Sequence, residues 1–196
     1  MKMKTNLIIA ALVLVQAGGA SANSLIAPGE HKGIAKSTIT TTTSGEWNKL
    51  SRTDGPGVET WTRDGDNLNK VSFFGGIAPG LPIYKERNKK EAPLPKIAGN
   101  MLLPDIPTLL ESTYRSQYQV NRMNIDSQDL ATINGKQAIR FTYSYMRGED
   151  EVERKGEAVA TIINKKLYMV TYEAPAIYFF GKDLEDFRRI SQNLKF

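Results

Sequence analysis

The segment from Asp129 to Pro175 places the strongest constraint on how this 196-residue chain can fold. Asn134-Gly135 lies between two segments of alternating polar and apolar residues, which is the strongest short-range signal for a β-hairpin. Both residues of such a turn need a positive φ, which asparagine and glycine adopt at low cost. Two further polar joints follow, at 148–151 and at Asn164-Lys165. We therefore predict three consecutive hairpins that form a four-stranded antiparallel meander.

Residues 1–22 have the three parts of a secretory signal peptide. Lys2 and Lys4 form a basic start, Leu7 to Val15 is an apolar run, and Ala20-Ser21-Ala22 is a small-residue cleavage site. The apolar run is too short to span a bilayer, which takes about 20 residues. We expect cleavage near Ala22 and a periplasmic or secreted protein. We expect no stable membrane anchor, because the chain has no cysteine to carry a lipid.

The composition argues against most catalytic chemistry. The chain has one histidine, His31, and no cysteine, which excludes zinc and transition-metal sites built from these two residue types. It has no P-loop, no nucleophile elbow and no glycine-rich dinucleotide motif. Without residues 1–22 the chain has 24 basic and 21 acidic residues, and this net charge of +3 indicates a mildly basic surface, not the clustered lysine and arginine that bind nucleic acid. We therefore predict no enzymatic activity, no cofactor, no metal and no nucleic-acid partner.

The segment Asp64-Gly65-Asp66-Asn67 resembles the start of a calcium-binding loop. An EF-hand needs an oxygen ligand at its fifth position and a bidentate glutamate at its twelfth. Leu68 and Gly75 occupy these positions. We therefore predict a plain β-turn here.

The N-terminal part is expected to be simple. We predict that residues 23–46 are a flexible or edge-strand lead-in, with a loose segment over Asn23 to Lys36 and a polar strand over Ser37 to Ser44. The first clear strands of the domain are then expected at Trp47–Arg52, Val58–Arg63 and Leu68–Phe74.

A long loop is predicted over residues 75–103, which with Pro104 contain four glycines and five prolines and show no periodicity. Loops of this length are uncommon unless they are functional or mobile. The centre of the loop is basic, and it is either a solvated surface segment or a contact site for an anionic partner or a membrane headgroup. The candidate partner-binding residues are Tyr84, Lys85, Arg87, Lys89 and Lys90.

Two helices are predicted. The first begins at Pro104 with Asp105 as its cap and Pro107 in its first turn, and its apolar stripe includes Leu109 and Leu110. The second spans Asp183 to Leu194, with acidic residues early and basic residues late, as the helix dipole favours. The buried stripe of the second helix is expected to comprise Leu184, Phe187, Ile190 and Leu194.

The remaining elements complete the expected sheet. A strand is predicted over Tyr118 to Ile125, before the meander. The third and fourth meander strands, Ala158–Ile163 and Leu167–Tyr172, are apolar on both sides, which is typical of central strands. The apolar run Ala176 to Phe180 is expected to pack into the core. The tyrosines at 143, 145, 168 and 172 are interpreted as cross-strand packing or, alternatively, as a ligand-binding face.

These elements predict a single α+β domain over 47–196, in which an antiparallel sheet is covered by two or more helices. The pattern WxxDGxxLNxVxFxxGI at Trp61–Ile77 and the chain end, where KLYMVTYEAP precedes FxxxDLEDFRRISQNLKF, resemble the PsbP-like fold group. That group comprises the extrinsic photosystem protein and exported bacterial relatives. The resemblance implies an accessory or binding role without enzymatic activity, and it implies no photosynthetic role.

We expect an exported, non-enzymatic binding or accessory protein of the cell envelope, with another envelope protein as its partner. The alternative is a small-molecule or lipid carrier with a pocket between sheet and helix, beneath Leu109 and Leu110. A carboxylate-based hydrolase would need two acids facing one cleft. The densest acidic segment, 149–153, is interpreted as a solvated hairpin tip. The oligomeric state is not predicted.

Overall fold

The computed structural model describes residues 23–120, 122–148 and 151–196. Neither helix in this part of the chain is long and apolar enough to cross a membrane. The elements, in chain order, are β1 (Ser24–Ile26), β2 (Gly29–Ile34), β3 (Ile39–Thr43), β4 (Trp47–Lys49), β5 (Val58–Thr62), β6 (Lys70–Ile77), α1 (Asp105–Tyr118), β7 (Arg122–Ile133), β8 (Lys136–Met146), β9 (Glu153–Ile163), β10 (Lys166–Pro175) and α2 (Phe179–Gln192).

Eight strands form one antiparallel sheet in the order β1-β4-β5-β6-β10-β9-β8-β7. The predicted meander is confirmed, and its strands β9 and β10 are interior strands of the sheet. Its tight turns have the expected backbone, because Asn134 and Gly135 have φ of 46° and 73° and Asn164 and Lys165 have φ of 50° and 63°. The predicted α+β class is also confirmed.

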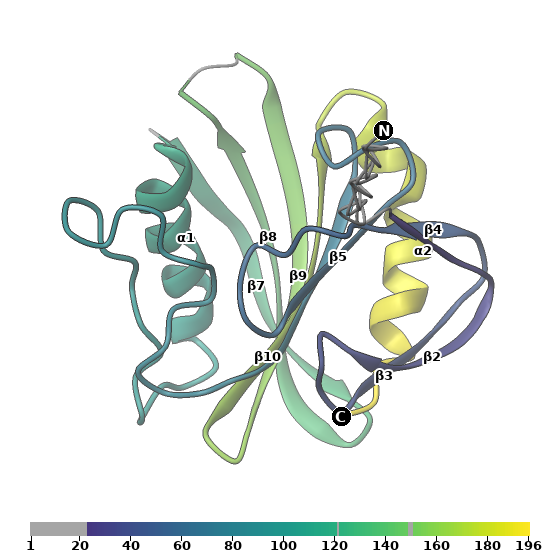
Figure 1. Cartoon of the computed structure of the whole chain (residues 1–196), viewed down its shortest axis with the longest axis horizontal. Coiled ribbons are helices and arrows are strands. Elements are labelled where there is room, and N and C mark those ends of the chain that lie inside the picture. Colours follow the sequence, from purple (N-terminus) through teal and green to yellow (C-terminus); the bar gives the residue numbers. More distant parts are fainter. Residues whose placement is uncertain (1–22, 121, 149–150) are drawn as a thin grey trace, which may run out of the picture.

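Both faces of the sheet are covered (Figure 1). Helix α1 lies on one face, and α2 lies on the other together with the separate β2–β3 hairpin. Each face has its own core cluster of buried residues. In β10, Leu167 and Met169 pack toward α1, whereas Val170 and Tyr172 pack toward α2. A strand buried on both faces needs apolar residues at successive positions, which explains the near-continuous apolar sequence of β10.

The predicted loose segment over Asn23 to Lys36 is wrong, because it contains β1 and β2. β1 is an edge strand of the main sheet, and β2 pairs with β3, which confirms the strand predicted at 37–44. Contacts with the C-terminal part of the chain hold this hairpin in place. Thr40 exchanges two backbone hydrogen bonds of 2.9 Å with Lys195, and the Thr41 hydroxyl donates to the Ile190 carbonyl at 2.7 Å. These contacts are distant in sequence, so local patterns do not reveal them.

The predicted long loop is present, and part of it packs into the core. After β6 ends at Ile77, residues 78–104 form neither helix nor strand. Four of their side chains are nonetheless buried in the cluster beneath α1, at positions Ile83, Tyr84, Leu94 and Ile97. An isolated bridge between Pro82 and Lys96 closes the loop on itself. The loop therefore packs down onto the domain as a folded part of it.

The predicted boundary between α1 and the next strand is wrong. Tyr118 is the last residue of α1, and Gln119 ends the helix in the left-handed region with φ of 50°. The strand then runs without a turn from Arg122 to Ile133, with a register shift between Ile125 and Ser127. The start of α1 also differs from the prediction, because Asp105 is its first residue and accepts a hydrogen bond from the Leu102 N–H at 2.9 Å.

The apolar run after β10 divides in two, so the expectation that all of it packs into the core is wrong. Ile177 and Tyr178 are 87% and 69% exposed. Phe179 and Phe180 are partly buried and pack on the second core cluster. They belong to α2, which begins at Phe179 instead of Asp183. The predicted stripe of α2 is confirmed at its buried residues Phe187 and Ile190.

Candidate functional site

The predicted contact residues of the long loop separate into one buried and four exposed side chains. Tyr84 is 1% exposed, and its ring lies 5.4 Å from that of Phe74 and 6.0 Å from that of Tyr118. It is a core residue that anchors the loop, and its side chain does not reach a partner. The four cations stay on the surface, at Lys85, Arg87, Lys89 and Lys90.

The loop is also tied down through its backbone. The Lys85 N–H donates to the Asp54 carbonyl at 2.6 Å, which joins the loop to the turn before β5. The Leu94 N–H donates to the Glu86 carboxylate at 3.2 Å, and Ile97 donates to the Leu81 carbonyl at 3.0 Å. The four cations therefore project from a fixed base.

An apolar hollow of about 300 Å³ lies on one side of this base. Leu81 is 51% exposed beside it, so a large aliphatic side chain remains accessible to a partner. Two lysines from the predicted set stand around the apolar residues. The hollow is lined by Pro56, Ile77, Leu81, Pro82, Tyr84, Lys85, Glu86 and Lys89.

A second, cationic hollow of about 280 Å³ is polar and contains four cationic and two anionic side chains. Arg52 forms an ion pair with Asp66. Lys70 forms an ion pair with Glu173, which is buried behind the lining residues. Residues from five separate segments meet in it. The lining residues are Arg52, Asp54, Thr60, Asp66, Asn67, Lys70, Arg87, Tyr118 and Arg147.

Both hollows are lined by the turn before β5 and by the long loop. From the turn before β5, Pro56 lines the apolar hollow and Asp54 lines the cationic one. From the long loop, Lys85 and Lys89 line the first and Arg87 lines the second. We call the two hollows and the exposed cations at 85, 87, 89 and 90 the loop surface. It offers apolar contact and positive charge side by side.

A buried ion pair lies behind the cationic hollow. The Glu173 side chain is 1% exposed, and its Oε2 lies 2.9 Å from Nζ of Lys70. The hydroxyls of Tyr143 and Tyr145 donate to the same carboxylate at 2.7 Å and 3.1 Å, and Tyr114 donates to it as well. Four donors thus satisfy one carboxylate, as a buried charge requires.

The pKa values follow from this geometry. Burial opposes ionisation of Glu173, but the Lys70 ammonium and the tyrosine hydroxyls outweigh it and lower the pKa of the carboxyl. Burial likewise opposes the charge of Lys70, yet Glu173 raises its pKa well above the usual value. Burial raises the pKa of Tyr143 well above 10.0, and the Glu173 charge adds to it. The tyrosines therefore remain protonated donors, and the cluster joins β6, β8, β10 and α1.

A second buried carboxylate lies on the α2 side. Glu157 is 1% exposed and is paired with Arg140 and with Arg188, whose Nη2 lies 3.0 Å from Oε2. It links β8, β9 and α2. In the sequence, Glu157 follows the acidic segment 149–153 that is interpreted as a solvated hairpin tip, and no pattern there indicates that Glu157 is buried.

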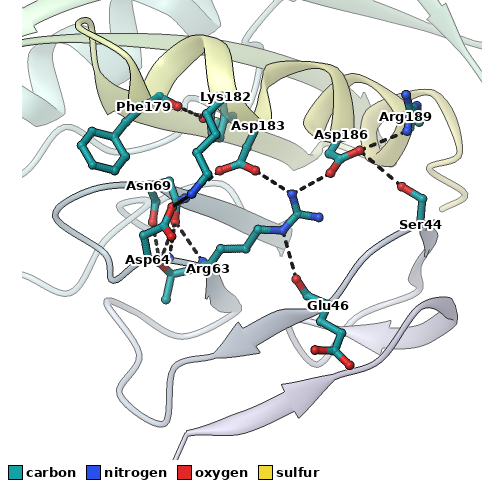
Figure 2. Close-up of polar contacts among 12 residues, drawn as sticks. Ser44, Glu46, Arg63, Asp64, Asn69, Phe179, Lys182, Asp183, Asp186 and Arg189 are labelled. Carbon is teal, nitrogen blue, oxygen red and sulfur yellow. Dashed lines mark hydrogen bonds and ion pairs between the residues drawn. The ribbon is translucent and has the colours of Figure 1, made fainter.

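A third network joins α2 to the turn after β5 (Figure 2). Nη1 of Arg63 lies 2.6 Å from carboxylate oxygens of both Asp183 and Asp186. The Asn69 amide donates to Asp183 at 2.8 Å and to Asp64 at 2.7 Å. Because Asp183 is 3% exposed, this contact fixes the helix against the sheet.

The turn at Asp64-Gly65-Asp66-Asn67, which resembles the start of a calcium-binding loop, is held by hydrogen bonds and ion pairs within the protein. The Asn69 side-chain oxygen accepts from the N–H groups of Arg63 and Asp64 at 2.9 Å and 3.1 Å. Lys182 lies 2.7 Å from the Asp64 carboxylate, and Arg52 pairs with Asp66. Across the described residues, no three or more histidine, cysteine or acidic side chains are grouped so that they could hold a metal ion.

Comparison with solved structures identifies the architecture. No protein-family model matches the sequence, and no curated protein matches it. The structure is similar to that of the cyanobacterial PsbP protein CyanoP from Synechocystis sp. PCC 6803, with a TM-score of 0.56 and 15% identity over 93% of this chain and 98% of that chain. The chain has a PsbP-like fold.

Two further solved structures are similar to the chain at lower TM-scores. The Ran-binding protein Mog1p of Saccharomyces cerevisiae has a TM-score of 0.47 and 10% identity, and the alignment covers 90% of this chain and 96% of that chain. LpqN of Mycobacterium tuberculosis, which is involved in cell envelope biogenesis, has a TM-score of 0.35 and 8% identity, with 91% and 86% covered. The resemblance to PsbP-like proteins noted in the sequence is confirmed for the fold.

Proposed function

We propose that this chain is an exported, non-enzymatic binding protein of the cell envelope that holds a partner protein on the loop surface. The observation that carries the proposal is the packed loop, which fixes an apolar hollow and a cationic hollow beside each other. Apolar anchors in a pocket supply binding energy, and surrounding charges select the partner. The partner is expected to present an apolar side chain flanked by carboxylates.

The carrier alternative is less well supported. It needs a pocket beneath Leu109 and Leu110, but these side chains are 6% and 0% exposed and belong to a continuous core cluster with the sheet. Tyr114 of the same helix is also buried, where it donates to Glu173. Side chains fill the space that a ligand would need.

The proposal of a non-enzymatic role rests on how the acidic groups are used. Asp54 and Asp66 line one hollow, which is the arrangement a carboxylate hydrolase would need. Asp66 is committed to an ion pair with Arg52. The buried carboxylate behind the hollow, that of Glu173, is satisfied by four donors and serves the fold.

A pull-down from an envelope fraction tests the binding surface. Lys85→Glu/Lys89→Glu places two acids around the apolar hollow, and an acidic partner should then be recovered at about a tenth of the wild-type level or less. Lys165→Glu/Lys166→Glu makes the same charge change on the β9–β10 turn and should leave recovery unchanged. Equal losses in both variants would indicate a general charge effect, and no specific partner with the wild type would refute the proposal.

Export can be tested on its own. The predicted cleavage site at Ala20 to Ala22 lies outside the described residues, whereas strand β1 begins at Ser24. Mass spectrometry of the protein from its host should give the mass of residues 23–196. A full-length protein found in the cytoplasm would contradict the proposed location without affecting the binding test.

A further inference from the structure

Exposed apolar side chains gather at one end of the sheet. Antiparallel β6 and β9 begin at this end, and β8 and β10 finish there. Each of these strand ends carries a large apolar residue at least 36% exposed. These residues are Leu68, Met146, Val152, Ile177 and Tyr178. Scattered surface apolar residues are ordinary, but a group at one place indicates an interaction site.

Two hydrogen bonds hold the segments of this end together. The Ala176 N–H donates to the Glu153 carbonyl at 2.9 Å, which places Ile177 beside the segment of Val152. Nη1 of Arg154 donates to the Asn67 carbonyl at 2.7 Å, which joins the segment of Leu68 to β9. We call these three segments, 67–68, 151–153 and 176–178, the apolar end; Met146 lies beside them on β8, opposite Glu153.

The backbone at the centre of the apolar end is strained. Tyr178 has φ of 68° and ψ of −60°, and the Phe179 N–H donates to the Ile177 carbonyl at 2.8 Å. This is the γ-turn with positive φ, which is rare for any residue other than glycine. Such strain persists only where the surroundings impose it, and it concentrates at functional sites.

Contacts between Tyr172 and the first residues of α2 impose this turn. The Tyr172 hydroxyl donates to the carbonyls of Phe179 and Phe180 at 2.8 Å and 3.2 Å, and its ring stacks on that of Phe180 at 5.5 Å. The network in Figure 2 then fixes the first turn of α2, with Lys182 on Asp64. With Phe179 and Phe180 held inward, the two residues before them project outward.

The charges of the apolar end decide between its possible occupants. Glu151 and Glu153 are exposed on either side of Val152, and neither forms an ion pair within the described part of the chain. Carboxylates beside an apolar patch repel anionic lipid headgroups. They attract lysine and arginine.

We propose that the apolar end is a second docking surface, which binds a protein segment that carries apolar side chains beside lysine or arginine. Its chemistry is the reverse of the loop surface, which is apolar and cationic. The two surfaces meet at Asn67, which lines the cationic hollow, but the apolar side chains of the second surface line neither hollow; they are Leu68, Val152, Ile177 and Tyr178. A protein with both can hold two partners of opposite charge.

The experiment is an NMR titration of the ¹⁵N-labelled mature chain with two synthetic peptides of equal length, one alternating leucine and lysine and one alternating leucine and glutamate. The leucine–lysine peptide should shift the amide signals of 67–68, 151–153 and 176–179 saturably. The leucine–glutamate peptide should leave them in place. Equal binding of both peptides, or shifts confined to other residues, would overturn the proposal.

Variants separate the two components of this surface. Ile177→Ser/Tyr178→Ser should weaken binding of the leucine–lysine peptide at least about tenfold, whereas Leu130→Ser, at an 81% exposed position on β7, should not. Glu151→Gln/Glu153→Gln keeps every apolar side chain and should weaken binding and reduce its salt dependence. Binding to anionic lipid vesicles that requires Ile177, or self-association through it without peptide binding, would show that the occupant is not the one proposed.

Discussion

At the scale of single residues, the buried carboxylate of Glu173 carries much of the organisation of the α1 side. Lys70 and three tyrosines from β8 and α1 converge on it. Removing it leaves the ammonium of Lys70 buried without its partner. Glu173→Ala should therefore lower the free energy of unfolding by about 3–5 kcal/mol, measured by urea denaturation. Glu46→Ala, at an exposed position, should change it by less than about 0.5 kcal/mol.

The same carboxylate makes stability depend on acid pH. Its pKa is lower in the folded protein than in the unfolded chain, so its contribution is present above pH of about 4.3. That contribution is lost as the pH falls through the folded-state pKa. The variant Lys70→Met/Glu173→Gln cannot titrate at either position and should lose less stability than the wild type as the pH falls below about 4.3. Parallel curves for the two proteins would contradict this assignment.

The tyrosine at 143 reaches Glu173 only because its cross-strand neighbour is Gly156. A Cβ at position 156 would lie 2.2 Å from the Tyr143 ring. Gly156→Ala should displace the ring and destabilise the fold by about 1–3 kcal/mol, with a change in near-UV circular dichroism. Gly181→Ala is the matched control, because the added methyl meets nothing within 4 Å inside α2 and should stabilise the protein. Equal effects of the two changes would refute the packing argument.

Sequence patterns predict these single residues poorly. The alternation of β8 was readable, so Tyr143 and Tyr145 could be placed on one face of a strand. The sequence does not reveal that they share Glu173 as a partner, because Glu173 follows them by some thirty positions. Its burial also depends on Lys70, which lies on a third strand. The basic residues of the long loop were found by composition, but the burial of Tyr84 depends on α1.

At the scale of elements, the tight hairpins are encoded locally. Gly135 has φ of 73°, a conformation that costs a residue with a Cβ about 1–2 kcal/mol. Gly135→Ala should destabilise the meander by that amount in urea denaturation without a change of fold. An unchanged midpoint would contradict the cost assigned to the positive φ at this position.

Elements fixed by distant contacts escaped prediction. Strand β2 looks like a loose segment until β3 and the chain end at Lys195 are in place. Helix α2 begins at Phe179 because Tyr172 holds the carbonyl there, which no capping pattern in the sequence indicates. Ile177 and Tyr178 were expected to be buried, because an apolar run normally predicts burial, but both are exposed.

At the scale of the molecule, a meander extended by β6, β5, β4 and β1 forms one sheet with both faces covered. CyanoP has a similar fold at 15% identity, so most aligned positions carry different residues in two chains of this architecture. The proposed functions lie outside the sheet. They are assigned to exposed side chains of the loop surface and of the apolar end, which are not needed for packing in the core.

Site-specific photo-crosslinking in the native host tests the central proposal most directly. A photoreactive residue at Leu81 or Arg87, within the loop surface, should give a covalent adduct with one envelope protein. The same residue at Lys166, on the β9–β10 turn, should give none. Adducts at all three positions, or at none of the loop positions while the protein remains folded and in place, would contradict a partner held on the loop surface.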